Sequence, residues 1–305
     1  MSGDRLSLAA RAMPAIMRLR GSKRIYASAA RTLADVDRLK RRPEPFAPPF
    51  GYDTELTITL ERQGEWPVYT VAPHGGDGAR RVLYTHGGTW IHEISPRHWM
   101  LIRALVFETG ATFTVPIFPG APVGTAAVVV PWVADLLAGL IALAGPDRVT
   151  AMGDSAGGAI TLSAVQLLRD RQTAGPGRTI LISPAIDLRF VDPRIAEIEP
   201  RDPALSVPGP RAAAELWRGG LSIEDPLVSP LLGDLARLGP ISLFCGSRDI
   251  CYPDSLTLAA KASEAGVDIE FHDEKDLLHV YPLMPIPEAR RARAVMAARI
   301  LASVG

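Results

Sequence analysis

The chain has 305 residues, of which 47% are hydrophobic, and its 33 basic and 33 acidic side chains give a formal net charge of zero. That length and apolar content suffice for the core of one large domain, and the zero balance excludes a nucleic-acid binder that works through a globally basic surface. Two cysteines, Cys245 and Cys251, are too few to staple such a chain, which excludes a disulfide-framework secreted protein.

The N-terminal segment carries most of the charge asymmetry. Residues 1–42 hold eleven Lys and Arg against three Asp, a net charge of +8, so the remainder sums to −8. Four arginines interrupt the apolar run that a secretory signal would need, and we expect a cytoplasmic protein. They are Arg5, Arg11, Arg18 and Arg20. An amphipathic, Arg-rich and acid-poor segment is also typical of an organellar transit peptide, which is the alternative.

Residues 5–42 predict two helices separated by Gly21 and Ser22. Opposite charge would let these helices dock onto the acidic remainder of the chain, whereas a basic face beside an apolar stripe also suits an anionic membrane. We expect docking, with membrane contact as the alternative. The first helix places its apolar side chains on one face, opposite Arg11 and Arg18: Leu6, Met13, Ile16 and Met17.

After a proline-rich connector at residues 43–49, Glu55–Arg62 alternates in polarity and Trp66–Val71 is β-rich, so we predict paired strands. Strands and helices then alternate, which predicts an α/β fold with a mostly parallel sheet and helices on both faces. The predicted strands are Arg81–Thr85, Ala111–Val115, Arg148–Met152, Thr179–Ser183, Ile241–Cys245 and Val267–His272. The predicted helices are Pro96–Glu108, Ala126–Ala144, Ala156–Arg171, Pro253–Ala265 and Pro287–Ala302.

Two stretches depart from this regular alternation. Thr109–Pro146 carries one charge, Asp135, and is long enough to span a bilayer, but prolines punctuate it and we expect a buried strand, a loop and a helix covering the sheet. Residues 187–239 separate two strands, contain seven prolines and include a short helical piece at Pro210–Arg218. A long insertion of this kind is usually a lid or a binding loop.

The most informative motif is Gly-x-Ser-x-Gly at residues 153–157, between a predicted strand and a predicted helix. In that context the motif forms a sharp turn that exposes the hydroxyl of Ser155 at the carboxyl end of the sheet, so we predict a nucleophile. The alternative is an ordinary tight turn in which Ser155 caps the helix.

A serine nucleophile needs hydrogen-bond donors for the oxyanion of its tetrahedral intermediate. We expect the amide of Ala156, the residue after the nucleophile, to be one donor. His-Gly-Gly occurs twice, at residues 74–76 and 86–88, and only the second copy follows a predicted strand. We therefore assign Gly87 and Gly88 as the other donors and interpret the first copy as a loop.

The nucleophile also needs a histidine base and a carboxylate that fixes its tautomer, in the chain order Ser, acid, His. Two histidines follow Ser155, and we prefer His279, which lies in a loop, to His272, which lies within a predicted strand. Asp249 follows the preceding strand and is the predicted acid. Its rivals are Asp254, which is typical of a helix start, and Asp273 and Asp276, which lie in a predicted loop.

These motifs, with His86-Gly87-Gly88-Thr89-Trp90 and Asp225-Pro226-Leu227-Val228-Ser229-Pro230, resemble the hormone-sensitive-lipase-like family of α/β-hydrolase esterases from about residue 80 onward. The resemblance implies an eight-stranded α/β-hydrolase core and a carboxylic ester hydrolase without cofactor. It implies a cap built from N-terminal helices and linker (1–50) on a catalytic domain (51–305) with an insertion at about 187–239. The implied triad is Ser155, Asp249 and His279, with oxyanion donors Gly87, Gly88 and Ala156.

The chain departs from the family pattern at three places. Thr89 stands where a third glycine is usual, Ile250-Cys251 where Pro-Leu is usual, and Val280-Tyr281 where Gly-Phe is common. None removes a catalytic group, so we expect the chemistry to persist in a pocket of different shape.

We expect a small-molecule ester of short to medium acyl length as substrate and no nucleic-acid partner. We also expect no metal, because the histidines are scattered along the chain. Two other functions share this fold: a non-catalytic ligand receptor, and a hydrolase or transferase that uses the same triad on amides, lactones or acyl acceptors. Four aromatic residues are candidates for lining the substrate pocket, with core packing or exposure as the alternative. They are Trp90, Trp217, Tyr252 and Tyr281.

Overall fold

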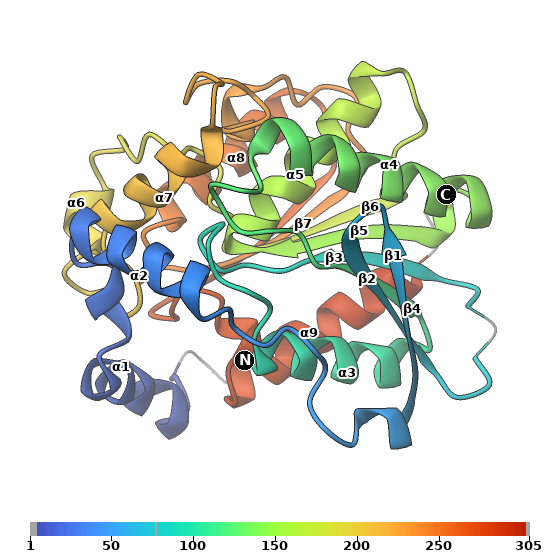
Figure 1. Cartoon of the computed structure of the whole chain (residues 1–305), viewed down its shortest axis with the longest axis horizontal. Coiled ribbons are helices and arrows are strands. Elements are labelled where there is room, and N and C mark those ends of the chain that lie inside the picture. Colours follow the sequence, from blue (N-terminus) through green and yellow to red (C-terminus); the bar gives the residue numbers. More distant parts are fainter. Residues whose placement is uncertain (1–4, 77, 303–305) are drawn as a thin grey trace.

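The computed structural model describes residues 5–76 and 78–302, and one eight-stranded sheet forms its centre (Figure 1). The strands are β1 (Leu56–Gln63), β2 (Trp66–Pro73), β3 (Arg81–Thr85), β4 (Thr112–Pro116), β5 (Val149–Asp154), β6 (Arg178–Ile182), β7 (Ile241–Gly246) and β8 (Ile269–Glu274). Their order is β1-β2-β4-β3-β5-β6-β7-β8. The first two neighbouring pairs are antiparallel and the remaining pairs are parallel, so the predicted mixed, mostly parallel sheet is confirmed.

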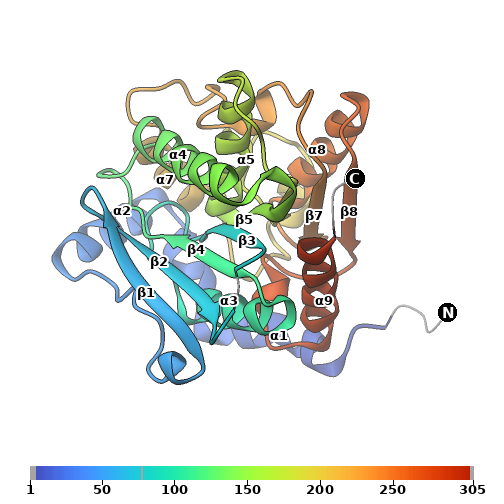
Figure 2. The same cartoon turned by 90° about the vertical axis from the view of Figure 1, so that its right-hand side faces the viewer.

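Helices cover both faces of this sheet, as Figure 2 shows. They are α1 (Leu8–Arg20), α2 (Ala29–Arg41), α3 (Pro96–Thr109), α4 (Ala126–Ala144), α5 (Ser155–Asp170), α6 (Ile195–Ile198), α7 (Pro208–Arg218), α8 (Tyr252–Glu264) and α9 (Pro287–Leu301). One apolar cluster lies between the sheet and α4, α5 and α8, and a second lies between the sheet and α3 and α9. The predicted strands and the predicted helices from residue 96 onward are present, with bounds that differ by at most two residues at either end. The two N-terminal helices begin later than predicted, at Leu8 and Ala29, because Ser22–Tyr26 form a 3-10 helix.

The apolar stretch at 109–146 folds into β4, a loop and α4, as expected. Val129, Val133 and Leu137 of α4 are fully buried against the sheet and α5. Among the described residues α4 is also the one helix whose length and composition would allow it to cross a membrane, and 39% of its apolar window is buried. Its proline, Pro131, lies within the first two turns and does not interrupt the helix.

Two segments far apart in the sequence, the N-terminal helices and the insertion after β6, pack against each other. The N-terminal helices α1 and α2 flank a short 3-10 helix, η1 (Ser22–Tyr26), and the insertion after β6 contributes α6 and α7 (Figure 1). Gly209 of α7 packs so closely on Tyr26 that a Cβ atom there would have to displace that residue. The Lys23 ammonium donates to the backbone carbonyls of Glu199 and Asp202.

Opposite charge does not dock this cap in the way the sequence suggested. Within the described residues, the basic side chains of residues 1–42 form ion pairs only inside the N-terminal segment (residues 1–50). The ion pairs of this segment with the body use two acids, Asp35 and Glu44, which face the ring nitrogens of His92 at 3.4 and 3.2 Å. The basic side chains that do pair are Arg38, with Asp35 and Glu44, and Lys40, with Asp37. The cap is therefore held by packing and backbone hydrogen bonds, because most of its positive charge faces solvent.

The apolar face of α1 also differs from the prediction. Ala10, Met13 and Met17 are buried, but Ile16 is 38% exposed. Leu6 precedes the helix, which begins after Ser7, whose hydroxyl caps it by accepting from the amide of Ala10. The buried face is therefore narrower than a full helical stripe.

Candidate active site

Ser155 lies at the junction of β5 and α5, where the chain turns sharply. Its φ of 49° is in the left-handed region, which is costly for a non-glycine residue and requires support from its surroundings. Gly157 provides part of that support, because any Cβ atom there would overlap the carbonyl oxygens of Thr85 and His86. The predicted strand–turn–helix context is thus present, and the Ser155 side chain is 8% exposed.

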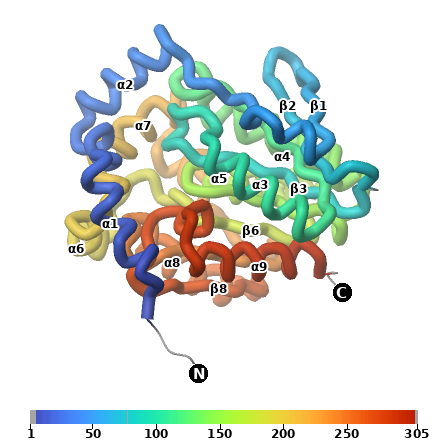
Figure 3. Tube along the Cα trace, turned by 90° about the horizontal axis from the view of Figure 1, so that it is seen from below, coloured from blue at the N-terminus to red at the C-terminus, as the bar shows by residue number. Residues whose placement is uncertain are grey.

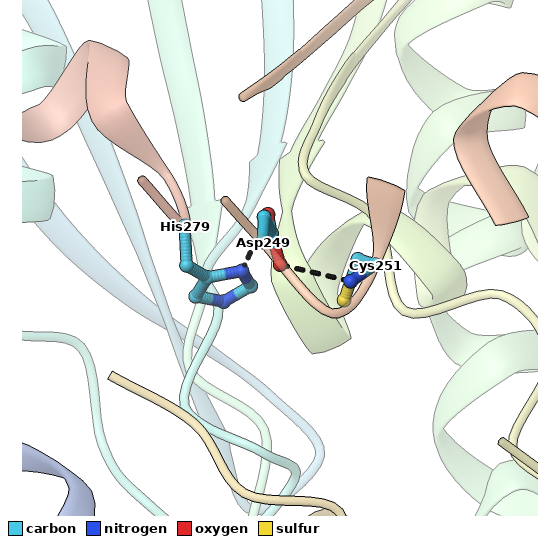
Figure 4. Close-up of side chains that lie close together, drawn as sticks. All are labelled: Asp249, Cys251 and His279. Atoms are coloured by element: carbon cyan, nitrogen blue, oxygen red, sulfur yellow. Dashed lines mark hydrogen bonds and ion pairs between the residues drawn. The ribbon is translucent and has the colours of Figure 1, made fainter. Parts of the chain in front are cut away.

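His279 lies between Ser155 and Asp249 and hydrogen-bonds to both. Its Nε2 is 2.9 Å from Ser155 Oγ, and its Nδ1 is 2.9 Å from Asp249 Oδ2. Figure 4 shows the imidazole pointing at the carboxylate, from the loop after β8 to the loop after β7. The rival histidine, His272, lies in β8 with its ring stacked on Phe244. The structure therefore brings together the three predicted residues.

Burial and charge set the protonation of this chain. Burial opposes ionisation of Asp249, but the facing His279 and the hydrogen bonds to the carboxylate outweigh it and lower the pKa of Asp249. Burial alone would lower the pKa of His279, yet the charge and hydrogen bond of Asp249 and the nearby Asp202 and Asp154 raise it. Asp249 is therefore a carboxylate that donates no proton, so His279 donates from Nδ1 and presents Nε2 to the hydroxyl of Ser155.

Cys251 adjoins the acid without forming a disulfide. Its backbone amide donates to Asp249 Oδ1 at 2.9 Å (Figure 4). The side chains of Asp249, Cys251 and His279 have possible metal-ligand atoms within 4.8 Å of one another. Burial raises the pKa of the Cys251 thiol well above its usual range, and the Asp249 and His279 atoms already bond each other. The group fits a hydrogen-bonded triad better than a metal site, because metal binding needs a thiolate and a free imidazole nitrogen.

The loop after β3 corrects one predicted oxyanion donor. The amide of Gly87 donates to Asp154 Oδ1 at 3.0 Å, so it is not available to a substrate. The amides of Gly88, Thr89 and Ala156 have no acceptor within the described part of the chain. Thr89 and Trp90 have φ values of 54° and 59°, so the third position of the loop keeps a left-handed backbone although it is not glycine.

Asp154 organises this loop, a role that the sequence did not reveal. It is 1% exposed, and its Oδ1 also accepts from the Tyr84 hydroxyl at 2.5 Å. Its Oδ2 lies 3.2 Å from His98 Nε2. The amide of Ser95 donates to His98 Nδ1 at 2.8 Å, which places the ring proton on Nε2, facing Asp154. Burial opposes the ionisation of Asp154, but His98, Tyr84 and the Gly87 amide outweigh burial and lower the pKa of this carboxyl.

Asp202, in the insertion, is a second buried acid that sequence reasoning missed. Its Oδ2 accepts from the amide of Ile250 at 3.1 Å, next to the catalytic acid, and its Oδ1 accepts from the amides of Ala204 and Leu205. Burial and the charge of Asp249 raise the pKa of Asp202 to about 6. A proline at position 250, the usual family residue, would have no amide hydrogen for this bond. The isoleucine at position 250, where the family usually has proline, was therefore the sequence feature that could have pointed to a hydrogen-bond acceptor such as Asp202.

The four aromatic candidates do not share one environment. Trp90, after the oxyanion loop, and Trp217, in α7, are 2% and 1% exposed and stack with centroids 6.1 Å apart. Tyr281 is also fully buried. Tyr252 is half-buried and donates from its hydroxyl to Asp273. The two tryptophans join the insertion to the oxyanion loop through packing, and a role in lining the substrate pocket stays a prediction.

Comparison with known proteins places this geometry in context. The sequence profile of a family described as alpha/beta hydrolase fold matches residues 82–283. An acetyl-hydrolase of Streptomyces hygroscopicus is 32% identical over 252 residues, which cover 79% of this chain and 80% of that protein. A triacylglycerol lipase of Mycobacterium tuberculosis is 34% identical over 191 residues, which cover 62% of this chain and 39% of the lipase.

Solved structures give the same picture. A hormone-sensitive lipase from a metagenome library superposes with a TM-score of 0.82 and 26% identity, covering 99% of this chain and all of that one. A homologue of hormone-sensitive lipase, EstE7, also from a metagenome library, superposes with a TM-score of 0.81 and 26% identity over 97% of this chain and 99% of its own. The fold and its helical additions thus recur together in these proteins.

Proposed function

The chain belongs to the α/β-hydrolase-fold family, as the resemblance to hormone-sensitive-lipase-like esterases implied, and we propose that it is a serine carboxylesterase acting through Ser155, His279 and Asp249. The observation that carries the proposal is the hydrogen-bonded chain from Ser155 Oγ through His279 to Asp249, with both distances 2.9 Å. An esterase, a lipase and an acetyl-hydrolase among its relatives support the same chemistry.

The geometry supplies each step of acyl transfer. Ser155 Oγ attacks the ester carbonyl while His279 Nε2 takes its proton, and His279 then gives that proton to the departing alcohol. Water attacks the acyl-enzyme with His279 again as base, which releases the acid and restores Ser155. The Asp249 carboxylate stabilises the imidazolium and keeps the ring proton at Nδ1.

The oxyanion donors follow from which amides are free. The amide of Ala156, in the first turn of α5, and those of Gly88 and Thr89 replace the original choice of Gly87. Each donor of this kind contributes about 3–4 kcal/mol to the transition state. Donors on a helix N-terminus benefit further from its dipole.

Short to medium acyl chains are the proposed substrate class, because acetyl-hydrolases among the relatives support a small acyl group. That support does not separate esters from lactones or amides, so the test includes all three bond types.

The test is a hydrolysis assay on a series of aryl esters of increasing acyl length, with the matching amides and a lactone. We expect the wild-type protein to hydrolyse the short esters fastest and Ser155→Ala to lose at least about a thousandfold in kcat. Cys251→Ala, adjacent to the acid but outside the proton path, is the control and should retain activity. Hydrolysis that persists in Ser155→Ala would contradict the proposal.

A further inference from the structure

Helix α1 has a second apolar face, which no described part of the chain covers. Its inner face, with Ala10, Met13 and Met17, is buried. On the outer side Leu8 is 80% exposed and Leu19 is 88% exposed, values that leave almost the whole side chains in water. Figures 1 and 3 both place α1 at the edge of the molecule. These two leucines therefore bury almost no apolar area in the fold.

Helical geometry groups these side chains into one stripe flanked by arginines. With about 100° of rotation per residue, Leu8, Ala12, Ala15 and Leu19 fall within roughly 60° of one another. All four are exposed, and so are the neighbouring side chains on both borders. Arg11 and Arg18 lie along one border of this stripe and Ile16 along the other. We call this stripe and its borders the outer face of α1.

The arginines of the outer face have no ion-pair partner among residues 5–76 and 78–302. Neither Arg11 nor Arg18 forms an ion pair with any described residue. Arg18 and Arg20 suit the C-terminal end of the helix, where the dipole favours positive charge. Arg5 and Arg11 lie at the opposite end, where no acid occupies the first turn and the dipole disfavours them. The fold therefore does not account for their presence.

A groove beside the N-terminal end of α1 adds a third observation. It is an open hollow of about 630 Å³ lined by Arg5, Leu6, Arg11, Arg248 and Asp276, three guanidiniums against one carboxylate. The buried Nε of Arg248 has no hydrogen-bond partner in the described chain. Guanidinium groups bind phosphate oxygens in a bidentate manner, so this groove has the chemistry for a phosphodiester.

We propose that the outer face of α1 and this arginine groove bind the surface of anionic phospholipid bilayers. The leucines would enter the boundary between head groups and acyl chains, the flanking arginines would meet lipid phosphates, and the groove would hold one head group. An antiparallel two-fold pairing of two copies through α1 would place the arginine border of one copy against that of the other. A nucleic acid would leave the leucines in water. A bilayer would cover the leucines with acyl chains and would also supply phosphates to the arginines.

Sedimentation with vesicles tests this binding and does not depend on hydrolysis. The full chain is mixed with vesicles of phosphatidylcholine and phosphatidylglycerol in equal parts, and with vesicles of phosphatidylcholine alone. We expect binding to the anionic vesicles, weaker binding to the neutral ones, and loss of binding at about 1 M salt, where the screening length falls to about 3 Å. Each arginine removed from the face should weaken binding about fivefold.

Matched variants separate the face from the rest of the surface. Arg11→Gln with Arg18→Gln, and Leu8→Ala with Leu19→Ala, should each weaken binding to anionic vesicles while hydrolysis of a soluble ester is unchanged. Arg62→Gln with Arg97→Gln removes the same charge from exposed positions elsewhere, and Leu60→Ala with Leu143→Ala removes two exposed leucines elsewhere. Both control variants should bind as the wild type does.

Three results would overturn the proposal. The first is wild-type protein that does not sediment with anionic vesicles. The second is equal loss of binding in the face variants and their matched controls. The third is a concentration-dependent dimer, seen by sedimentation velocity without lipid, that Leu8→Ala with Leu19→Ala dissociates, because the face would then pair copies of the chain.

Discussion

At the scale of single residues, two buried acids outside the triad accept hydrogen bonds from backbone amides in the loops around the site. Asp154 binds the Gly87 amide, and Asp202 binds the Ile250 amide beside Asp249. Both are almost fully buried, and both act on loops that carry catalytic groups. Buried acids with backbone donors are well placed to fix loop geometry, because an unpaired carboxylate at the same place would be costly.

The first residue-scale prediction concerns His98, which donates to Asp154. His98→Ala should lower kcat about tenfold and leave KM nearly unchanged, because a displaced oxyanion loop weakens an interaction made chiefly in the transition state. Steady-state kinetics on a soluble aryl ester measure both constants. His272→Ala is the control, because it removes a half-buried histidine of the edge strand β8 that touches neither Asp154 nor the triad. A rise in KM with kcat intact would assign His98 to substrate binding instead.

The second residue-scale prediction concerns pH. His279 must be neutral to accept the proton of Ser155, so activity rises as pH passes upward through its pKa, which its acidic neighbours raise. Asp202→Asn removes one of those negative charges, stabilises the imidazolium less and lowers the pKa of His279. The acidic limb of kcat/KM should therefore move to lower pH.

Asp254→Asn provides the matched control for that pH profile. Asp254 is also buried, and burial raises its pKa to about 8, but it faces Asp187 and Asp192 and not the triad. Its substitution should leave the acidic limb in place. An unchanged limb in Asp202→Asn, with only a uniform fall in rate, would show that Asp202 acts through loop geometry alone.

At the scale of elements, the sequence predicts the strands of the sheet and the helices that cover it well, because apolar residues recur in each of them with a regular spacing. β3 and α4 have the predicted bounds, and the strand–turn–helix at Ser155 follows from its glycines. The Gly87 assignment failed because the partner of an amide depends on where a side chain from another strand, Asp154, lies. Asp202 was missed because it reaches the triad from an irregular insertion without a motif.

The element-scale prediction tests the packing of α7 on the oxyanion loop. Trp217→Ala leaves a cavity against Trp90 and should lower the free energy of unfolding by about 3–5 kcal/mol, with activity falling in parallel. Thermal or denaturant unfolding measures the first quantity. Trp217→Phe retains most of the packing and should lose less in both.

A different result would favour the original interpretation of Trp217 as part of the substrate pocket. In that case Trp217→Ala would change the preference among acyl chain lengths while leaving the unfolding midpoint unchanged. The comparison of the two variants separates packing from substrate contact.

At the scale of the whole molecule, the zero net charge conceals a basic cap on an acidic body. The structure shows that this cap is held by packing and by hydrogen bonds to backbone carbonyls, with its arginines directed to solvent. A charged side chain that pairs across the contact between cap and body differs from one that faces solvent only in its burial and its contacts. Neither of these can be determined from the sequence.

The most direct test of the central claim is active-site labelling with a fluorophosphonate, which reacts with a serine that has been activated by a base. We expect one label per chain, located by peptide mass spectrometry on Ser155, with labelling and hydrolysis lost together in proportion. Ser155→Ala should not be labelled, and His279→Ala should be labelled far more slowly. Label on another residue of an active protein, or no label at all while esters are hydrolysed, would contradict the assignment of Ser155 as nucleophile.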